Sequence, residues 1–207
     1  MDIQLFEGER VRLTPFDPDK DAEIESKWTH DAEYLRLLSP DPARPLAPGQ
    51  IKKKREEVAK EKSHNRFEFA VRLRADDRLI GFVQLHRIEW NNGNGWLTLG
   101  IGAAEDRGKG YGAEALQLIL RYVFDELNLH RLSAAAFEHN AGALRLLEKA
   151  GFTVEVRRRQ AIHREGRRWD EIHLGLLREE WRQVEGRLAP AGSRPERGGK
   201  SKVESGK

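Results

Sequence analysis

The sequence places three glycines at every second position, Gly108, Gly110 and Gly112, directly before an amphipathic segment. The spacing of the apolar residues in that segment predicts a helix over residues 110–127. Glycines leave the backbone N–H groups approachable, and the helix N-terminus adds unpaired donors at the positive end of the helix dipole. We therefore expect a cradle for an anion, best suited to a phosphate or pyrophosphate.

Two basic residues, Arg107 and Lys109, flank the glycines and add charge at the rim of this cradle. The alternative is a tight strand-to-helix turn that only requires small residues, and it leaves these two charges unexplained. The spacing does not match a Walker A loop, because no G-K-[ST] follows four spaced residues. It does not match G-x-G-x-x-G either, because the third glycine comes one residue early. A nucleoside triphosphate and NAD are therefore disfavoured as ligands.

The remaining segments predict a mixed α/β domain. Strands are expected at residues 11–16, 67–73, 79–90, 96–102, 131–137, 154–160 and 169–177. Helices are expected at residues 17–29, 31–38, 50–63, 110–127, 140–150 and 178–185. The strands between 67 and 102 form an antiparallel meander, and the next helix leads to strand 131–137 as a β-α-β crossover, which should be right-handed.

The length of 207 residues is that of one ordinary domain. We expect this domain to cover residues 1–185, followed by a disordered basic tail over residues 186–207, which is rich in Gly, Pro, Ser and charge. The tail carries six basic and two acidic residues, which leaves a formal charge of −1 on the preceding 185 residues. Nucleic-acid binding through the tail and Arg157-Arg158-Arg159 is an open hypothesis, but the charge of the body counts against it.

Several protein classes are disfavoured by what the sequence lacks. Without cysteine, no disulfide, thiolate metal site or cysteine nucleophile is available. The seven histidines show no metal-ligand spacing, so we expect no metal site. The sequence starts without an apolar signal-peptide core, and no apolar stretch approaches the roughly 20 residues of a membrane span. We therefore expect a cytoplasmic protein that does not enter a membrane.

Two segments resemble, in order and spacing, the signatures of the GNAT superfamily of N-acetyltransferases. Residues 107–112, R-G-K-G-Y-G, match the acetyl-CoA loop Q/R-x-x-G-x-G/A. Residues 138–152, E-H-N-A-G-A-L-R-L-L-E-K-A-G-F, are similar to N-x-x-[SA]-x-x-L-[YL]-E-K-x-G-F. Segments 8–13 and 178–181 are similar to the branch that includes ribosomal-protein N-terminal acetyltransferases. The resemblance, over residues 8 to about 182, implies a mixed, mostly antiparallel sheet with a splayed parallel pair of strands, flanked by helices.

The resemblance also implies acetyl-CoA as co-substrate and a place for it. Backbone groups at the end of strand 96–102 would pair with its pantetheine arm, at Leu99, Ile101 and Gly102. The glycine loop would hold the pyrophosphate through Arg107, Gly108, Lys109, Gly110, Tyr111 and Gly112. Asn140 would bind the arm from the other side and cap its own helix at the same time.

The proton-transfer groups of many relatives are missing from this chain. Leu147 stands where many have a tyrosine acid, Ala143 stands where the ribosomal-protein branch has a serine, and the strand before the loop has no glutamate. Glu89, at the end of the neighbouring strand, is the candidate catalytic base because it could reach the site by geometry. Three further candidates are weaker: His86, Glu138 and His139. For these three and for Glu89, an exposed polar residue at a strand end is the simpler interpretation.

The sequence therefore predicts an acetyl-CoA-dependent N-acetyltransferase that transfers the acetyl group directly to a primary amine, either a protein N-terminus or a small-molecule amine. The alternative is a non-catalytic CoA-binding or sensing module, which the missing groups favour. Acidic residues crowd the segment 17–33 and could form a lip that attracts a cationic amine, although a solvated helix face explains them equally well. Whether the chain forms a homodimer stays open.

Overall fold

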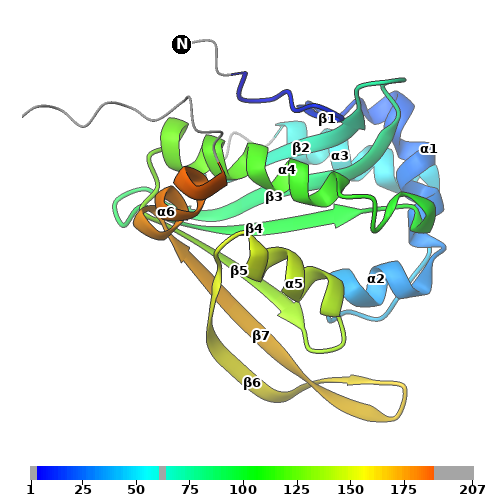
Figure 1. Cartoon of the computed structure of the whole chain (residues 1–207). Coiled ribbons are helices and arrows are strands. Elements are labelled where there is room, and N and C mark those ends of the chain that lie inside the picture. The colour runs from blue at the N-terminus through cyan, green and yellow to red at the C-terminus, as the bar shows by residue number, and fades with distance from the viewer. Residues whose placement is uncertain (1–3, 61–63, 189–207) are drawn as a thin grey trace, which may run out of the picture.

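Seven strands form one sheet in the order β1-β2-β3-β4-β5-β7-β6 (Figure 1). The computed structural model describes residues 4–60 and 64–188. The strands are β1 (Val11–Thr14), β2 (Phe67–Leu73), β3 (Leu79–Glu89), β4 (Asn94–Ile101), β5 (Arg131–Phe137), β6 (Thr153–Arg164) and β7 (Arg167–Leu177). All neighbours pair antiparallel except β4 and β5, which are parallel. The mixed, mostly antiparallel sheet that the sequence predicts is thereby confirmed.

Helices cover both faces of this sheet (Figure 1). They are α1 (Pro18–Thr29), α2 (Ala32–Leu38), α3 (Pro48–Lys60), α4 (Tyr111–Arg121), α5 (Ala141–Lys149) and α6 (Arg178–Leu188). Alternate side chains of a strand point to opposite faces. Val71 and Ile80 accordingly join the main apolar cluster with α4, whereas Ala70 and Leu79 join Trp28 of α1 in a second cluster.

Several boundaries differ from those expected. Helix α4 ends at Arg121, where the chain widens into a π-helical turn in which the Leu127 N–H donates to the Tyr122 carbonyl at 2.9 Å. The closing hairpin is longer than predicted because its turn takes only two residues, Glu165 and Gly166, which both have positive φ as a tight two-residue hairpin turn requires.

The expected tail at residues 186–207 lies outside the described residues from position 189 onward, and residues 186–188 continue α6. Across the two described stretches, none of the helices combines the length and the apolar character that a bilayer span needs.

Candidate active site

Strands β4 and β5 part after a short parallel stretch (Figure 1). Their pairing ends where Leu97 lies opposite Ala134, although β4 continues to Ile101 and β5 continues to Phe137. Beyond this point one edge of β4 has no strand beside it. The splayed parallel pair that the family resemblance implies is therefore present, and the gap between the strands opens towards the glycine loop.

The open edge of β4 presents main-chain groups at alternate residues. Gly102 donates its N–H to the Ile80 carbonyl at 2.8 Å, on the β3 side. Main-chain groups of successive residues point to opposite sides of a strand, so Gly100 also faces β3. Leu99 and Ile101 then direct their N–H and C=O groups into the gap.

Gly102, expected beside Leu99 in the site, is instead committed to the fold. Its carbonyl accepts a hydrogen bond from Arg107, and a Cβ at this position would lie 2.1 Å from the Trp28 ring. The expectation for Gly102 is therefore corrected: this glycine lets α1 approach the end of β4, and its N–H is not available to a ligand.

A cavity of about 490 Å³ adjoins the gap, between α2, the end of β4, the glycine loop and α5. It is lined by seven of the expected site residues: Leu99, Ile101, Arg107, Gly108, Gly110, Gly112 and Asn140. Lys109 and Tyr111 do not line it. A second cavity, of about 70 Å³, continues to the point where the strands part, at Leu97, Thr98, Ala134 and Ala135. The cavities thus reach from the glycine loop to the parting of the strands.

The backbone of the glycine loop is shaped to receive an anion. Gly108 and Gly110 have φ of 73° and 86°, and Gly110 begins α4 without a side-chain cap. The six N–H groups of residues 108–113 have no acceptor within the described part of the chain. A Cβ at Gly112 would lie 3.6 Å from Leu99 and Ile101, which themselves line the cavity. This concave set of donors fits a pyrophosphate.

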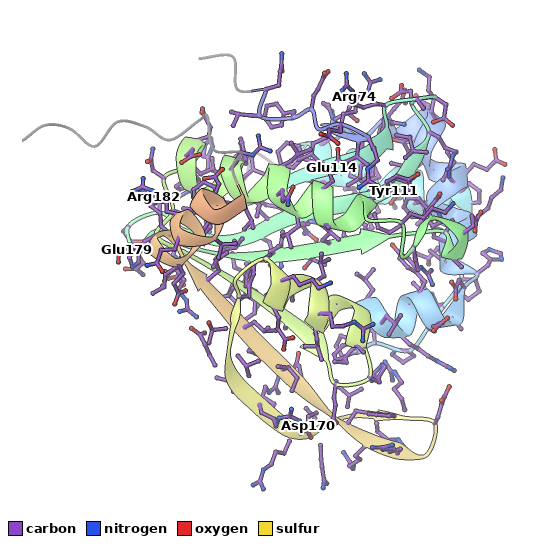
Figure 2. All side chains as sticks on the ribbon, in the orientation of Figure 1. Arg74, Tyr111, Glu114, Asp170, Glu179 and Arg182 are labelled. Carbon is purple, nitrogen blue, oxygen red and sulfur yellow. The ribbon has the colours of Figure 1, made fainter. Side chains whose placement is uncertain are left out.

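Arg10 and Glu114 brace this loop from outside the cavity. Glu114, on the first turn of α4 beside Tyr111 (Figure 2), accepts the Arg10 N–H at 2.7 Å and the Arg10 Nε at 3.0 Å. Arg10 Nη1 also donates to the Lys109 carbonyl at 2.9 Å. Burial raises the pKa of Glu114, but these bonds and that from the Val11 N–H outweigh it, so the pKa lies below its usual value. The brace fixes where α4 begins.

Arg107, expected as a free charge at the rim, has its charge compensated by the protein. Its Nη2 donates to Asp31 Oδ2 at 2.8 Å and to the Gly102 carbonyl, and its Nε donates to the Ile101 carbonyl at 3.3 Å. Its guanidinium also lies 5.4 Å from the centre of the Tyr34 ring. Arg107 therefore holds the loop against α2 while it lines the cavity.

Asn140 caps its own helix, as expected, and lies at the cavities where it is expected to bind the ligand. Its Oδ1 accepts the Ala143 N–H at 3.0 Å, which caps α5, and its Nδ2 donates to the Leu37 carbonyl of α2 at 3.4 Å. It also lines both cavities. The cap orients the amide, so a ligand in the gap would meet it across from Leu99.

Glu89, expected as the base, lies at the wrong end of β4. Its register partner is Asn94, the first residue of β4, whereas the gap begins beyond Leu97. Leu99 is five residues from Asn94, about 17 Å along a strand. Glu89 instead accepts the Asn92 side chain at 2.9 Å in the β3–β4 turn. The expectation that it reaches the site is wrong, because β3 and β4 are antiparallel and share that turn.

The weaker candidates for proton transfer have other partners. His86 bonds Thr98 Oγ1 at 3.2 Å, and burial lowers its pKa. Glu138 accepts the Asp170 N–H at 3.2 Å and pairs with Arg157. His139 stacks on Phe137, and burial lowers its pKa as well. None of the three lines either cavity.

Most acids of the segment 17–33 form ion pairs, some with lysines of the same helix and some with basic residues of other elements. Asp21 pairs with Arg72 at 2.7 Å, while Glu25 pairs with Arg55. The remaining acids that form ion pairs are Asp17, Asp19, Glu23 and Asp31, with Lys20, Lys52, Lys27 and Arg107. A strongly acidic lip is therefore not present over this part of the surface.

The basic run on β6 is compensated in the same way. Arg157 bonds Asp170 at 2.8 Å, and Arg158 pairs with Glu171 (Figure 2 labels Asp170). Of the three arginines in this run, Arg159 alone has no ion pair to a carboxylate of the described residues. This pairing weakens the case for a nucleic-acid-binding patch.

Tyr34 is a residue of the site that the sequence motifs do not identify. It is 8% exposed in the cluster with Trp28, yet it lines the larger cavity from α2. Burial raises its pKa, so the phenol remains a protonated donor. The available signal was its helical spacing to Leu37 and Leu38, which line the same cavity.

Comparison with known proteins extends these observations. The profile of the acetyltransferase (GNAT) domain matches residues 10–153. The "Probable N-acetyltransferase YjcK" of Bacillus subtilis is 36% identical over 180 residues, which cover 84% of this chain and 97% of that protein. YdaF of the same organism, provisionally named a ribosomal N-acetyltransferase, is 30% identical over 106 residues, covering 51% and 57%. A spermidine N-acetyltransferase from Vibrio cholerae, solved with CoA and spermine, matches with a TM-score of 0.73 over 83% of this chain and 97% of that chain, at 20% identity.

Proposed function

We propose, on the premise that this chain belongs to the GNAT family of acetyltransferases, that its acceptor is an α-amino group. Membership of the family gives the general activity, acetyl transfer with acetyl-CoA as co-substrate. The finer assignment concerns the amine: a primary amine of low pKa, such as the N-terminus of a protein or peptide.

The described residues would have distinct roles in binding acetyl-CoA and in stabilising the reacting carbonyl group. Bound acetyl-CoA supplies an acetyl group activated as a thioester. The N–H groups of residues 108–113 would hold the pyrophosphate, and Leu99 and Ile101 would pair with the pantetheine arm along the open edge of β4. The Leu99 N–H would also stabilise negative charge that develops on the carbonyl oxygen as the amine attacks.

One observation carries the proposal: the cavities hold no free carboxylate or imidazole among the described residues. Asp106 is the single carboxylate that lines them, and both its oxygens accept hydrogen bonds from Arg78, at 2.6 and 2.9 Å. Those bonds hold the pKa of Asp106 below its usual value, so it is a poor base. The acceptor must then arrive neutral or lose its proton to water.

The pKa of the amine sets the free energy that is needed to make it neutral at pH 7. An α-amino group has a pKa near 7.7–8.0, so making it neutral at pH 7 costs about 1 kcal/mol. A lysine-like amine has a pKa of about 10.4 and costs nearly 5 kcal/mol. A site without a base therefore favours the α-amine.

The compensated acids of segment 17–33 support the same choice. A polyamine is a multiple cation and calls for unpaired negative charge, whereas the ion pairs of Asp21, Glu25 and Asp31 leave little of it. The provisional name of the relative YdaF points to a ribosomal acceptor, and the Vibrio cholerae structure points to a polyamine. The charge pattern of this chain favours the first.

A matched set of acceptors tests the proposal through release of the CoA thiol. The set comprises a lysine-free peptide with a free N-terminus, the same peptide blocked at its N-terminus and carrying one lysine, and spermidine. We expect kcat/KM at pH 7 to be about 300-fold higher for the first peptide than for the lysine peptide, as the fractions of neutral amine predict. Its value should rise with pH through the pKa of the α-amine and level off about one unit above it, at about pH 9.

A preference for spermidine or for the lysine peptide would contradict the assignment. Leu147, where many relatives have a tyrosine, is 7% exposed in the core and carries no hydroxyl, which favours the second candidate, a CoA-binding module without activity. Binding of acetyl-CoA without release of the CoA thiol in the presence of any of the acceptors would establish that alternative.

A further inference from the structure

We infer that Arg145 and Lys149 form a second anion subsite, which binds the 3′-phosphate of CoA and distinguishes CoA from its 3′-dephosphorylated form. The inference rests on the proposed placement of the pyrophosphate on the glycine loop. CoA carries two separate anionic groups, a pyrophosphate and a phosphate monoester on the ribose. The loop accounts for the first group only.

Arg145 and Lys149 face the larger cavity from α5. They lie four residues apart, so they share one face of the helix with Gly142 and Leu146, and all four residues line the cavity. Both basic side chains are exposed. This places two cations on the wall opposite the start of α4.

Neither cation has a partner in the part of the chain that the structure describes. No ion pair or hydrogen bond involves either side chain, whereas the other arginine of the cavity, Arg107, is bonded to Asp31. Two like charges four residues apart destabilise a helix slightly. A phosphate monoester, with a charge of about −1.5 to −2 at pH 7, would reverse that repulsion through charge-assisted hydrogen bonds.

Arg145 and Lys149 lie where the adenosine end of CoA is expected. The thioester must lie towards the parting of the strands near Leu97, so the adenosine end lies at the opposite end of the cavity. Lys149 and Ala113 also line a groove of about 470 Å³ between α4, α5 and α6. Ala113 carries the last N–H of the glycine loop, so the two anion subsites adjoin at this residue.

Titration calorimetry with CoA and with 3′-dephospho-CoA tests the inference on the full chain. The variants are Arg145→Gln, Lys149→Gln and both together, and the control is Arg159→Gln, which removes an exposed, unpaired arginine from β6. We expect the wild type to bind CoA about tenfold more tightly than dephospho-CoA, as charge-assisted bonds to one phosphate predict. The double variant should bind the two ligands equally, with its affinity for dephospho-CoA unchanged.

Equal binding of both ligands by the wild type would overturn the inference and leave the pyrophosphate site intact. An equal loss of affinity for both ligands in the double variant would overturn it too, because the two side chains would then act on the pyrophosphate or on the fold. No binding of either ligand to the wild type would instead reject the proposed placement of CoA.

Discussion

Arg107 donates a hydrogen bond to Asp31 at 2.8 Å, although 76 positions separate the two residues in the sequence. Asp31 also accepts the Tyr34 N–H at 3.1 Å and so caps α2. One carboxylate thereby joins the glycine loop to the helix that lines the opposite side of the cavity. Bonds from the Tyr34 N–H and from Arg107 outweigh the effect of burial and hold the pKa of Asp31 below its usual value.

The first prediction is that Arg107 and Asp31 act as one unit. Arg107→Ala and Asp31→Asn should each lower the free energy of unfolding by about 1 kcal/mol, since Asn retains the cap and loses only the ion pair. The double variant should lose clearly less than the sum, with a coupling of about 0.5 kcal/mol or more. Urea unfolding of the four proteins measures this, and strict additivity would show that the pair is not coupled.

The second prediction separates ligand binding from folding at Gly112. Alanine fits there, because its Cβ would meet only ordinary contacts at 3.6 Å, whereas the extra methyl groups of valine would fill the space beside Leu99. We expect Gly112→Val to lower the affinity for CoA at least about tenfold by steric exclusion while Gly112→Ala retains it. Calorimetry gives the affinity, and thermal melts without ligand should agree within a few degrees. Wild-type affinity in the valine variant would place the pyrophosphate elsewhere.

The third prediction concerns acid stability through Asp106, which is 2% exposed and bonded to Arg78. Its folded pKa lies below the unfolded value of about 3.9, so the pair stabilises the fold above that pH and loses this effect as the pH falls through the folded pKa. Asp106→Asn should cost about 2 kcal/mol at pH 7 and progressively less below about pH 4.

Urea unfolding between pH 7 and pH 3 checks this dependence. Asp76→Asn is the matched control, because Asp76 is exposed and lies 3.8 Å from the same Arg78, so it should cost less at pH 7. A cost for Asp106→Asn that stayed constant down to pH 3 would contradict the prediction.

The fourth prediction follows from the position of Glu89 in the β3–β4 turn. Glu89→Gln should leave kcat/KM within about twofold of wild type, because loss of a general base usually costs a hundredfold or more and Glu89 cannot reach the gap. A hundredfold loss in the thiol-release assay would restore Glu89 as the base and remove the main argument for an acceptor of low pKa.

Local patterns were enough to predict the parts of the site that depend on short spacing. Gly108 and Gly110 precede α4 with N–H groups that no described residue accepts, as expected, and Asn140 caps α5, since both features follow from backbone chemistry within a few residues. The parting of β4 and β5 was available only through the family resemblance, because periodicity says nothing about where a pairing stops.

Contacts distant in sequence account for the expectations that failed. The sequence alone predicts a free charge at Arg107, because it does not show that Asp31 lies beside it. It likewise predicts an acidic lip over segment 17–33, because it does not show the ion pairs with Arg55 and Arg72. The expectation for Glu89 fails for a related reason. Glu89 ends β3 beside the start of β4, whereas the site lies at the other end of β4. Such pairings are set by the tertiary fold, which spacing along the chain does not encode.

Part of β4 has no hydrogen-bonded neighbour on one side among the described strands, although β4 lies in the middle of the sheet. An unpaired strand at the margin of a sheet commonly invites another chain to add to it. Here the open edge lies inside the sheet, between two strands that are still paired at one end, so it does not face other chains as an outer edge does. A slender molecule with regularly spaced amide groups that entered the gap would complete the hydrogen bonding that the polypeptide leaves unfinished.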